Sequence, residues 1–143
     1  MSCVNILVQR RAGAAHILSD GAAYIPSTGE LTQILQKTFP VPTLHMAVAS
    51  VGKPHISMFF ASALDRRFST FDEVIQFAPE VMPELFETFV DVQDADDSEG
   101  QMFFAGWLQD EGRPACFAMS YRGERSTRWS EITRGGAIRG STP

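Results

Sequence analysis

The chain has 143 residues, a net charge of −5 and 44% hydrophobic residues, which fits one domain over residues 1–143 with a real core. This composition excludes collagen-like and wholly disordered proteins, and no apolar run approaches the roughly 18 residues of a membrane span. Two cysteines cannot build a disulfide framework, and a strand-like run replaces a secretory signal at the N-terminus, so we expect a cytoplasmic protein.

Short strands are predicted over the first fifty residues. Residues 4–8 form a strand-like run, and residues 15–18 return after a short turn, which predicts a β-hairpin. A looser turn over residues 24–31 joins two short extended pieces. Residues 44–51 are an apolar run of the kind found in buried strands, and Gly52 ends it.

The middle of the chain has helical periodicity. Apolar residues at three- and four-residue spacing predict a helix over residues 56–68. Thr70 and Glu73 have the spacing of a capping box, so a second helix is expected to start there. Pro79 should end or kink this helix because it lacks an N–H, and Pro83 should lie in the first turn of a further helix.

Strands are predicted again in the last third. The acidic segment 91–100 is expected to be a loop. Residues 102–108 and 114–121 predict two strands joined as a hairpin, and residues 127–132 a further strand. We assign no element to the glycine-rich segment 135–141. Strands at both ends with helices between them favour an α+β fold, with helices packed on antiparallel sheet.

The charge of the chain is unevenly distributed. Residues 65–111 carry thirteen of the 17 acidic residues against two arginines, and residues 113–143 carry six arginines against two glutamates. A solvated acidic face and a basic end account for this pattern. Because the whole chain is acidic and lacks a concentrated basic groove, we expect no nucleic-acid partner.

Four features mark the joints between the predicted elements. Asp20 follows the first hairpin within the segment 17–22, Lys37 precedes a strand, the small apolar run 47–52 ends in glycine, and a second hairpin spans residues 104–114. This order resembles the N-terminal nucleophile (Ntn) hydrolases, and most closely the proteasome β-subunit and its bacterial relatives. The resemblance covers roughly residues 2–140. It implies two antiparallel sheets flanked by helices, as a complete or an incomplete αββα sandwich.

The resemblance also implies a mechanism. In this family the first residue supplies both the nucleophile and an α-amine that serves as its base, and the ordinary pKa of that amine, about 7.7–8.0, suits the task. Lys37 would favour the deprotonated nucleophile, Asp20 would hold Lys37, and the N–H of Gly52 would donate to the oxyanion. Without the resemblance, Lys37 is a surface residue and Asp20 a turn former.

Two residues compete for the role of nucleophile. If Met1 is removed, Ser2 carries an amine and a hydroxyl on the same residue, as the mechanism needs. The alternation of the first strand instead puts Cys3 at the matching position, although freeing its amine would need an unusual cleavage. A third interpretation is that neither is catalytic, with Ser2 in a frayed terminus and Cys3 a half-buried thiol.

No cofactor or metal is expected. His16, His45 and His55 lie in separate elements without metal-ligand spacing. The glycine-rich segment 135–141 lacks the Lys-Ser/Thr pair and the helix of a phosphate-binding loop. Family members continue past this segment into further helices and strands, so their supporting groups are expected to be missing here or to come from a partner chain.

Two functions therefore stand side by side. The first is hydrolysis of an amide or peptide bond, with Ser2 as the nucleophile. The alternative is a catalytically inactive relative that acts as a self-assembling scaffold or a binding module. Because family subunits stack through their helices, we expect a homo-oligomer, with a peptide or amide as the substrate and no membrane partner.

Overall fold

The computed structural model describes residues 3–25, 27–52, 55–93, 99–122, 128–132 and 136–139. Its helices are α1 (Ile56–Arg67) and α2 (Phe71–Gln93). Its strands are β1 (Cys3–Gln9), β2 (Ala14–Ser19), β3 (Ala22–Tyr24), β4 (Leu31–Ile34), β5 (Thr38–Val41), β6 (Met46–Val51), β7 (Glu99–Leu108), β8 (Arg113–Arg122), β9 (Arg128–Glu131) and β10 (Gly136–Arg139).

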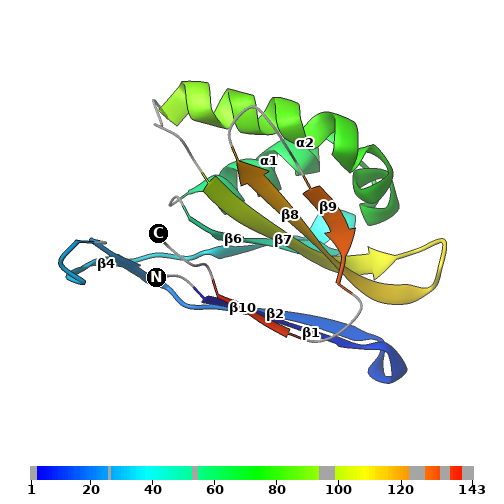
Figure 1. The fold of residues 1–143 in the computed structure, drawn as a ribbon. Coiled ribbons are helices and arrows are strands. Elements are labelled where there is room, and N and C mark those ends of the chain that lie inside the picture. Colours follow the sequence, from blue (N-terminus) through cyan, green and yellow to red (C-terminus); the bar gives the residue numbers. More distant parts are fainter. Residues whose placement is uncertain are drawn as a thin grey trace.

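These elements lie in layers, and the α+β class is confirmed (Figure 1). The central layer is an antiparallel sheet in the order β5-β6-β7-β8-β9. Both helices cover one face of this sheet, and the sheet β10-β1-β2 lies against the other face. The third sheet, β3-β4, is a two-stranded ribbon that projects from the body and is called the arm below.

Two hydrophobic cores hold the layers together. The larger core, between the helices and the central sheet, is rich in phenylalanine and includes Phe60, Phe71, Phe86 and Phe104. The smaller core, between the two sheets, contains Val4, Ile6, Ala49, Phe103, Ala105 and Cys116. The alternation of β1 explains the second core, because Val4 and Ile6 are buried while Asn5 and Leu7 face outward and are exposed.

Of the two outcomes predicted for Pro79, an end of the helix is wrong, and so is the further helix predicted to begin at Pro83. Helix α2 is continuous through both prolines. Pro79 lacks the N–H that would bond to the carbonyl of Ile75, and Pro83 lacks the N–H that would bond to the carbonyl of Pro79. Because these residues are four positions apart, the two missing hydrogen bonds lie one above the other along the helix. Pro79 is exposed and Pro83 half-buried, and the helix is anchored by a buried stripe beside them that includes Val74, Ala78 and Leu85.

The capping box forms in part. The N–H of Glu73 donates to Oγ1 of Thr70 at 3.2 Å, as predicted. The carboxylate of Glu73 accepts the N–H of Ser69 at 2.7 Å rather than that of Thr70. The start of α2 at Phe71 is therefore fixed from both directions, and only the reciprocal bond is made one residue earlier than in a capping box.

Two predicted irregular segments contain regular structure. The predicted loop 91–100 is wrong at both ends, because α2 runs to Gln93 and β7 begins at Glu99. The glycine-rich end, to which we assigned no element, contains β10, which pairs with β1 from Cys3↔Arg139 to Ile6↔Gly136. A strand formed through a partner more than a hundred residues away leaves little local signal.

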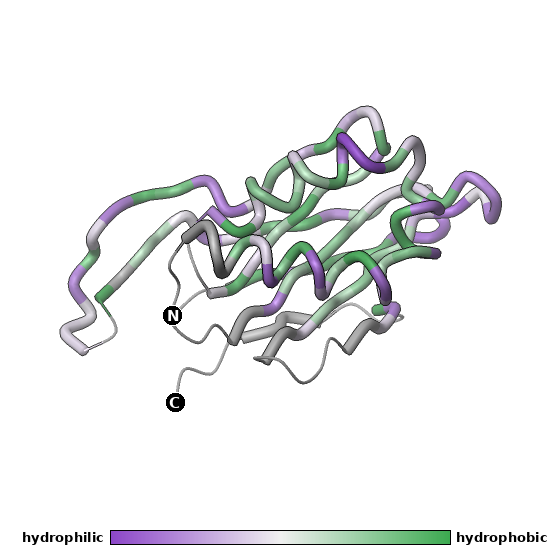
Figure 2. Tube along the Cα trace, turned by 90° about the horizontal axis from the view of Figure 1, so that it is seen from above, coloured by the Kyte–Doolittle hydropathy of each residue, from purple (hydrophilic) through white to green (hydrophobic). Residues whose placement is uncertain are grey.

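Hydrophilic residues mark several turns and also recur between hydrophobic ones along the helices (Figure 2). No helix in the described part of the chain combines the length and the apolar character that a membrane span needs.

Candidate active site

The candidate site lies where the arm joins the body. Asp20 lies between β2 and β3, where the chain enters the arm, and Lys37 lies between β4 and β5, where the chain leaves it. The N–H of Leu35 donates to the carbonyl of Gly21 at 2.6 Å, which joins the two segments at the base of the arm. Two residues that are seventeen positions apart therefore lie side by side.

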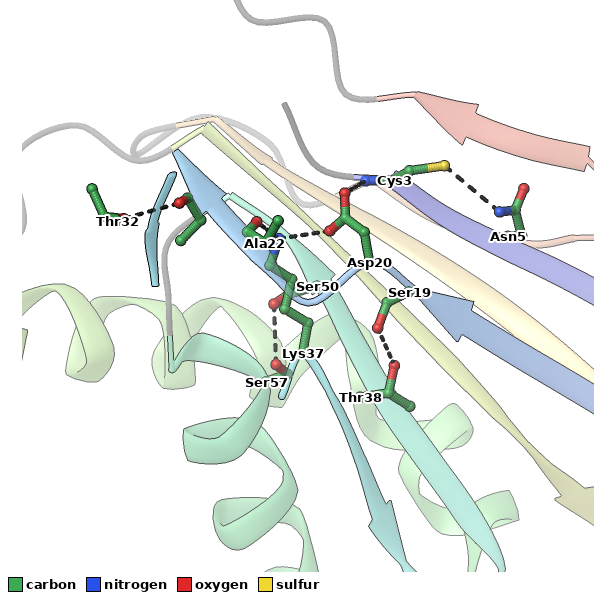
Figure 3. Close-up of polar contacts among 11 residues, drawn as sticks. Cys3, Asn5, Ser19, Asp20, Ala22, Thr32, Lys37, Thr38, Ser50 and Ser57 are labelled. Carbon is green, nitrogen blue, oxygen red and sulfur yellow. Dashed lines mark hydrogen bonds and ion pairs between the residues drawn. The ribbon is translucent and has the colours of Figure 1, made fainter. Parts of the chain in front are cut away.

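Oxygen atoms of Asp20 and Ala22 hold Lys37 (Figure 3). Its Nζ donates to Oδ1 of Asp20 at 2.7 Å and to the carbonyl oxygen of Ala22 at 2.5 Å. Only 9% of Lys37 is exposed. An ammonium group withdrawn from water to this extent is stable only when it is paired and hydrogen-bonded, and both conditions are met here.

Asp20 also holds the start of β1. Its second oxygen, Oδ2, accepts the backbone N–H of Cys3 at 3.1 Å. The backbone N–H of Asp20 in turn donates to the carbonyl of Cys3 at 3.1 Å. One carboxylate therefore connects the buried lysine to the peptide nitrogen that follows Ser2. Ser2 itself lies outside the described residues.

The thiol of Cys3 is placed differently. Cys3 lies on the outward face of β1 with Asn5, whose Nδ2 donates to Sγ at 3.6 Å. In Figure 3 this sulfur points away from Lys37. The structure thus brings Asp20, Lys37 and the backbone of Cys3 together, and it places the side chain of Cys3 apart from them.

Hydroxyl groups support the site from two sides. Oγ of Ser19 and Oγ1 of Thr38 lie 2.8 Å apart, which links β2 to β5. Oγ of Ser50 donates to Oγ of Ser57 at 3.1 Å, and both serines are buried. The register Thr38↔Ala49 puts Ser50 next to Lys37 across the β5–β6 pair.

Gly52 lies just beyond β6, two residues after Ser50. Its φ of 123° belongs to a region that residues with a Cβ rarely adopt, so the backbone turn there requires glycine. The structure therefore puts Gly52 at the same end of β6 as the residue beside Lys37.

The three histidines have other surroundings. His45 and His55 have φ values of 50° and 71°, and they occupy the left-handed turns before β6 and α1. Nδ1 of His45 lies 3.3 Å from Nε2 of Gln109, and His16 is exposed on β2. Among the described residues, no three His, Cys, Asp or Glu side chains group as metal ligands do.

Sequence reasoning missed the backbone groups of the site. The carbonyl of Ala22 accepts from Lys37, and the N–H of Cys3 donates to Asp20. A pattern of side chains along the sequence does not predict such contacts of the backbone. The pair of Ser50 and Ser57 had a weak signal, since each is a hydroxyl in an otherwise apolar stretch.

Comparison with known proteins gives no relative for this chain: no family model matches it, and no curated protein is significantly similar to it. A function must therefore be argued from the geometry of the site.

Proposed function

We propose that this chain is an N-terminal nucleophile hydrolase that cleaves an amide or peptide bond, with Ser2 as the nucleophile. One observation carries the proposal. A single carboxylate, that of Asp20, joins the buried Nζ of Lys37 to the peptide nitrogen directly after Ser2. A cation is thereby fixed beside the point where the mature N-terminus would begin.

The chemistry needs Ser2 to be the first residue of the mature chain. Its α-amine then takes the proton of its own hydroxyl while Oγ attacks the carbonyl carbon of the substrate. The tetrahedral intermediate collapses as the carbon–nitrogen bond breaks, and the ammonium group returns its proton to the leaving amine. Water, deprotonated by the same amine, then hydrolyses the ester on Ser2 and releases the acid.

Three further residues take roles in this scheme. The positive charge of Lys37 favours negative charge on the attacking oxygen, and Asp20 orients Lys37. The N–H of Gly52 donates to the oxyanion of the intermediate. The backbone of Gly52 supports this role, because a glycine at positive φ leaves no Cβ to obstruct the close approach of a ligand to the backbone.

The geometry favours Ser2 over Cys3. The N–H of Cys3 is bonded to Asp20, and its sulfur points away from Lys37 (Figure 3). The layers of the fold support the choice of hydrolase class. The N-terminal strand lies in a second sheet behind a helix-covered one, as in an Ntn sandwich that lacks one helical layer.

The test has two steps. Intact-mass measurement of the purified chain should show Ser2 as its first residue. A serine-reactive fluorophosphonate or peptide β-lactone should then label the wild type, and peptide mapping should place the adduct on Ser2. Ser2→Ala should abolish labelling and Lys37→Met should slow it at least tenfold, while Arg11→Ala, on an exposed turn away from the site, should label normally.

Two results would refute the proposal. One is a mature chain that retains residues before Ser2, because its α-amine is then locked in a peptide bond. The other is labelling of the wild type that is no faster than that of Ser2→Ala. Either result would favour the alternative function, a non-catalytic scaffold or binding module.

A further inference from the structure

Exposed apolar side chains are concentrated in one part of the molecule. The described residues include eight large hydrophobic side chains that are exposed, and five of them lie between positions 7 and 34. These five are Leu7, Leu18, Ile25, Leu31 and Ile34. Single exposed apolar residues are ordinary, but a group of them on neighbouring elements indicates an interaction surface. We call this group the β1–β4 surface.

Apart from Ile25, which directly follows β3, the β1–β4 surface belongs to strands that carry no formal charge. None of the residues of β1, β2, β3 and β4 is Asp, Glu, Lys or Arg, although 20% of the whole chain is charged. Solvent-facing strands usually carry charged side chains, which keep sheet faces and edges from associating. These four strands lack that protection.

Leu7 and Leu18 lie on the outer face of the three-stranded sheet. Ala15 and Ile17 of β2 pack inward with Val8 of β1, so the alternate residues face away from the central sheet. The register Leu7↔His16 and Asn5↔Leu18 makes the two leucines diagonal neighbours. Their exposed fractions are 47% and 66%, so no described part of the chain covers the two leucines on this face of β1 and β2.

The arm adds the other three apolar residues. It projects from the body in both views, and every residue of β4 is exposed (Figures 1 and 2). Ile34 is 79% exposed and Leu31 50%. A ribbon of two strands with no face packed on a core is only marginally stable in water. The arm therefore gains most from a surface that covers it.

The charge distribution favours a second copy of this chain as the occupant. Exposed acidic residues of α2, including Glu80, Glu84 and Glu87, lie in the helical layer, on the far side of the central sheet from β1 and β2 (Figure 1). Stacked sheets are about 10 Å apart, and the Debye length is about 8 Å at physiological salt. Two copies that meet through β1–β4 thus keep their acidic helices screened from each other, whereas stacking through helices would bring them together.

We infer that two copies of this chain associate through the β1–β4 surface, with the arm of each copy covering apolar residues of the other. A two-fold arrangement uses the same surface on both partners. A stable interface needs about 800 Å² per partner, less than a tenth of the 8543 Å² that one chain exposes. This inference does not rest on the proposed hydrolase activity, and it assigns a different surface from the helix stacking expected by resemblance.

The test is the mass of the full chain in solution. Light scattering after size exclusion, over about 1–100 μM, should give twice the 15.8 kDa of one chain. The variant Leu18→Lys/Ile34→Lys should be monomeric, because each copy then brings two cations into the interface. Both positions are well exposed, so the thermal unfolding transition should persist. The matched control Met58→Lys/Phe77→Lys alters exposed apolar residues on the helices and should remain dimeric.

Two results would overturn the inference. A wild-type chain that stays monomeric over the whole range shows that the β1–β4 surface does not bind a second copy. Dissociation of the helix variant, with the variant at Leu18 and Ile34 still dimeric, would move the interface to the helical layer.

Discussion

Asp20 and Lys37 form an ion pair, with 2.7 Å between Oδ1 and Nζ, across the base of the arm. The two partners differ in burial, since 9% of the Lys37 side chain is exposed and 34% of that of Asp20. Removing Asp20 therefore takes from a buried cation the carboxylate bonded to it, whereas removing Lys37 leaves a carboxylate that water can reach. The two single substitutions should differ in cost.

Asp20→Ala should lower the free energy of unfolding by about 2–3 kcal/mol, somewhat less than the loss of one partner from a fully buried pair. Lys37→Met should cost about 1 kcal/mol or less, because the thioether chain fills the same space. In the double variant the cost of losing Asp20 should largely disappear. Urea unfolding of all four proteins measures this coupling, and strictly additive costs would contradict the ion pair.

Asp72, in the first turn of α2, fixes the turn between β7 and β8. Its two oxygens accept the backbone N–H groups of Gln109 at 2.9 Å and Asp110 at 3.2 Å. Asp72→Ala should reduce stability by about 1–2 kcal/mol, since both bonds are charge-assisted but lie near solvent. Hydrogen exchange should accelerate at these two amides. Asp65→Ala, an exposed carboxylate on α1, should leave their exchange rates unchanged.

Cys116 is buried in the core between the two sheets. Desolvation, followed by the negative charge of Glu131, raises the pKa of its thiol to about 12. At pH 8, only about one molecule in ten thousand would then carry the reactive thiolate. A thiol reagent should therefore modify Cys3 alone in the folded protein and both cysteines in urea. Fast modification of Cys3→Ser at Cys116 would contradict this prediction.

The same shift in the pKa of Cys116 predicts how stability depends on pH. The unfolded thiol has its ordinary pKa of 9.0, below the folded one, so the unfolded state loses its proton first as the pH rises. The contribution of the neutral thiol is complete below about pH 9 and is lost as the pH rises toward 12, by up to about 1.4 kcal/mol per pH unit. Urea unfolding between pH 8 and 10 should show this fall for the wild type, and Cys116→Ala should reduce it.

Pro79 interrupts the hydrogen bonding of α2 on an exposed face. Pro79→Ala should restore the bond to the carbonyl of Ile75 and raise the free energy of unfolding by about 1–2 kcal/mol, after allowing for the greater freedom of the unfolded chain. Gln76→Ala, also exposed on α2, should change it by less than about 0.5 kcal/mol. A destabilised Pro79→Ala would show that the ring itself packs or fixes a bend.

Elements with a strong local pattern were predictable from the sequence. The alternation of β1 and the helical spacing in α1 both reflect contact with one core, and the predicted bounds of α1 differ from the observed ones by a single residue. The continuity of α2 was not predictable, because it depends on which side of the helix faces the sheet. Pro79 is exposed and Pro83 half-buried, so both lie beside the fully buried stripe that anchors the helix.

The candidate site was predictable as a set of residue types and not as a set of contacts. Asp20 and Lys37 were selected by their order along the chain, and their pairing follows from the arm that separates them. The bonds to the carbonyl of Ala22 and the N–H of Cys3 depend on tertiary placement of backbone. Strand β10 was not predicted for the same reason, because its pairing with β1 also depends on tertiary placement of the backbone.

The pairing Cys3↔Arg139 has a consequence for how the protein is made. The strand that precedes the candidate site keeps one side unpaired until residues 136–139 have left the ribosome. The sheet β10-β1-β2 can therefore start to form first, as the local β1–β2 hairpin, but is completed last, when β10 pairs with β1. Such a long loop closes slowly, so completion of this sheet should limit the rate of folding.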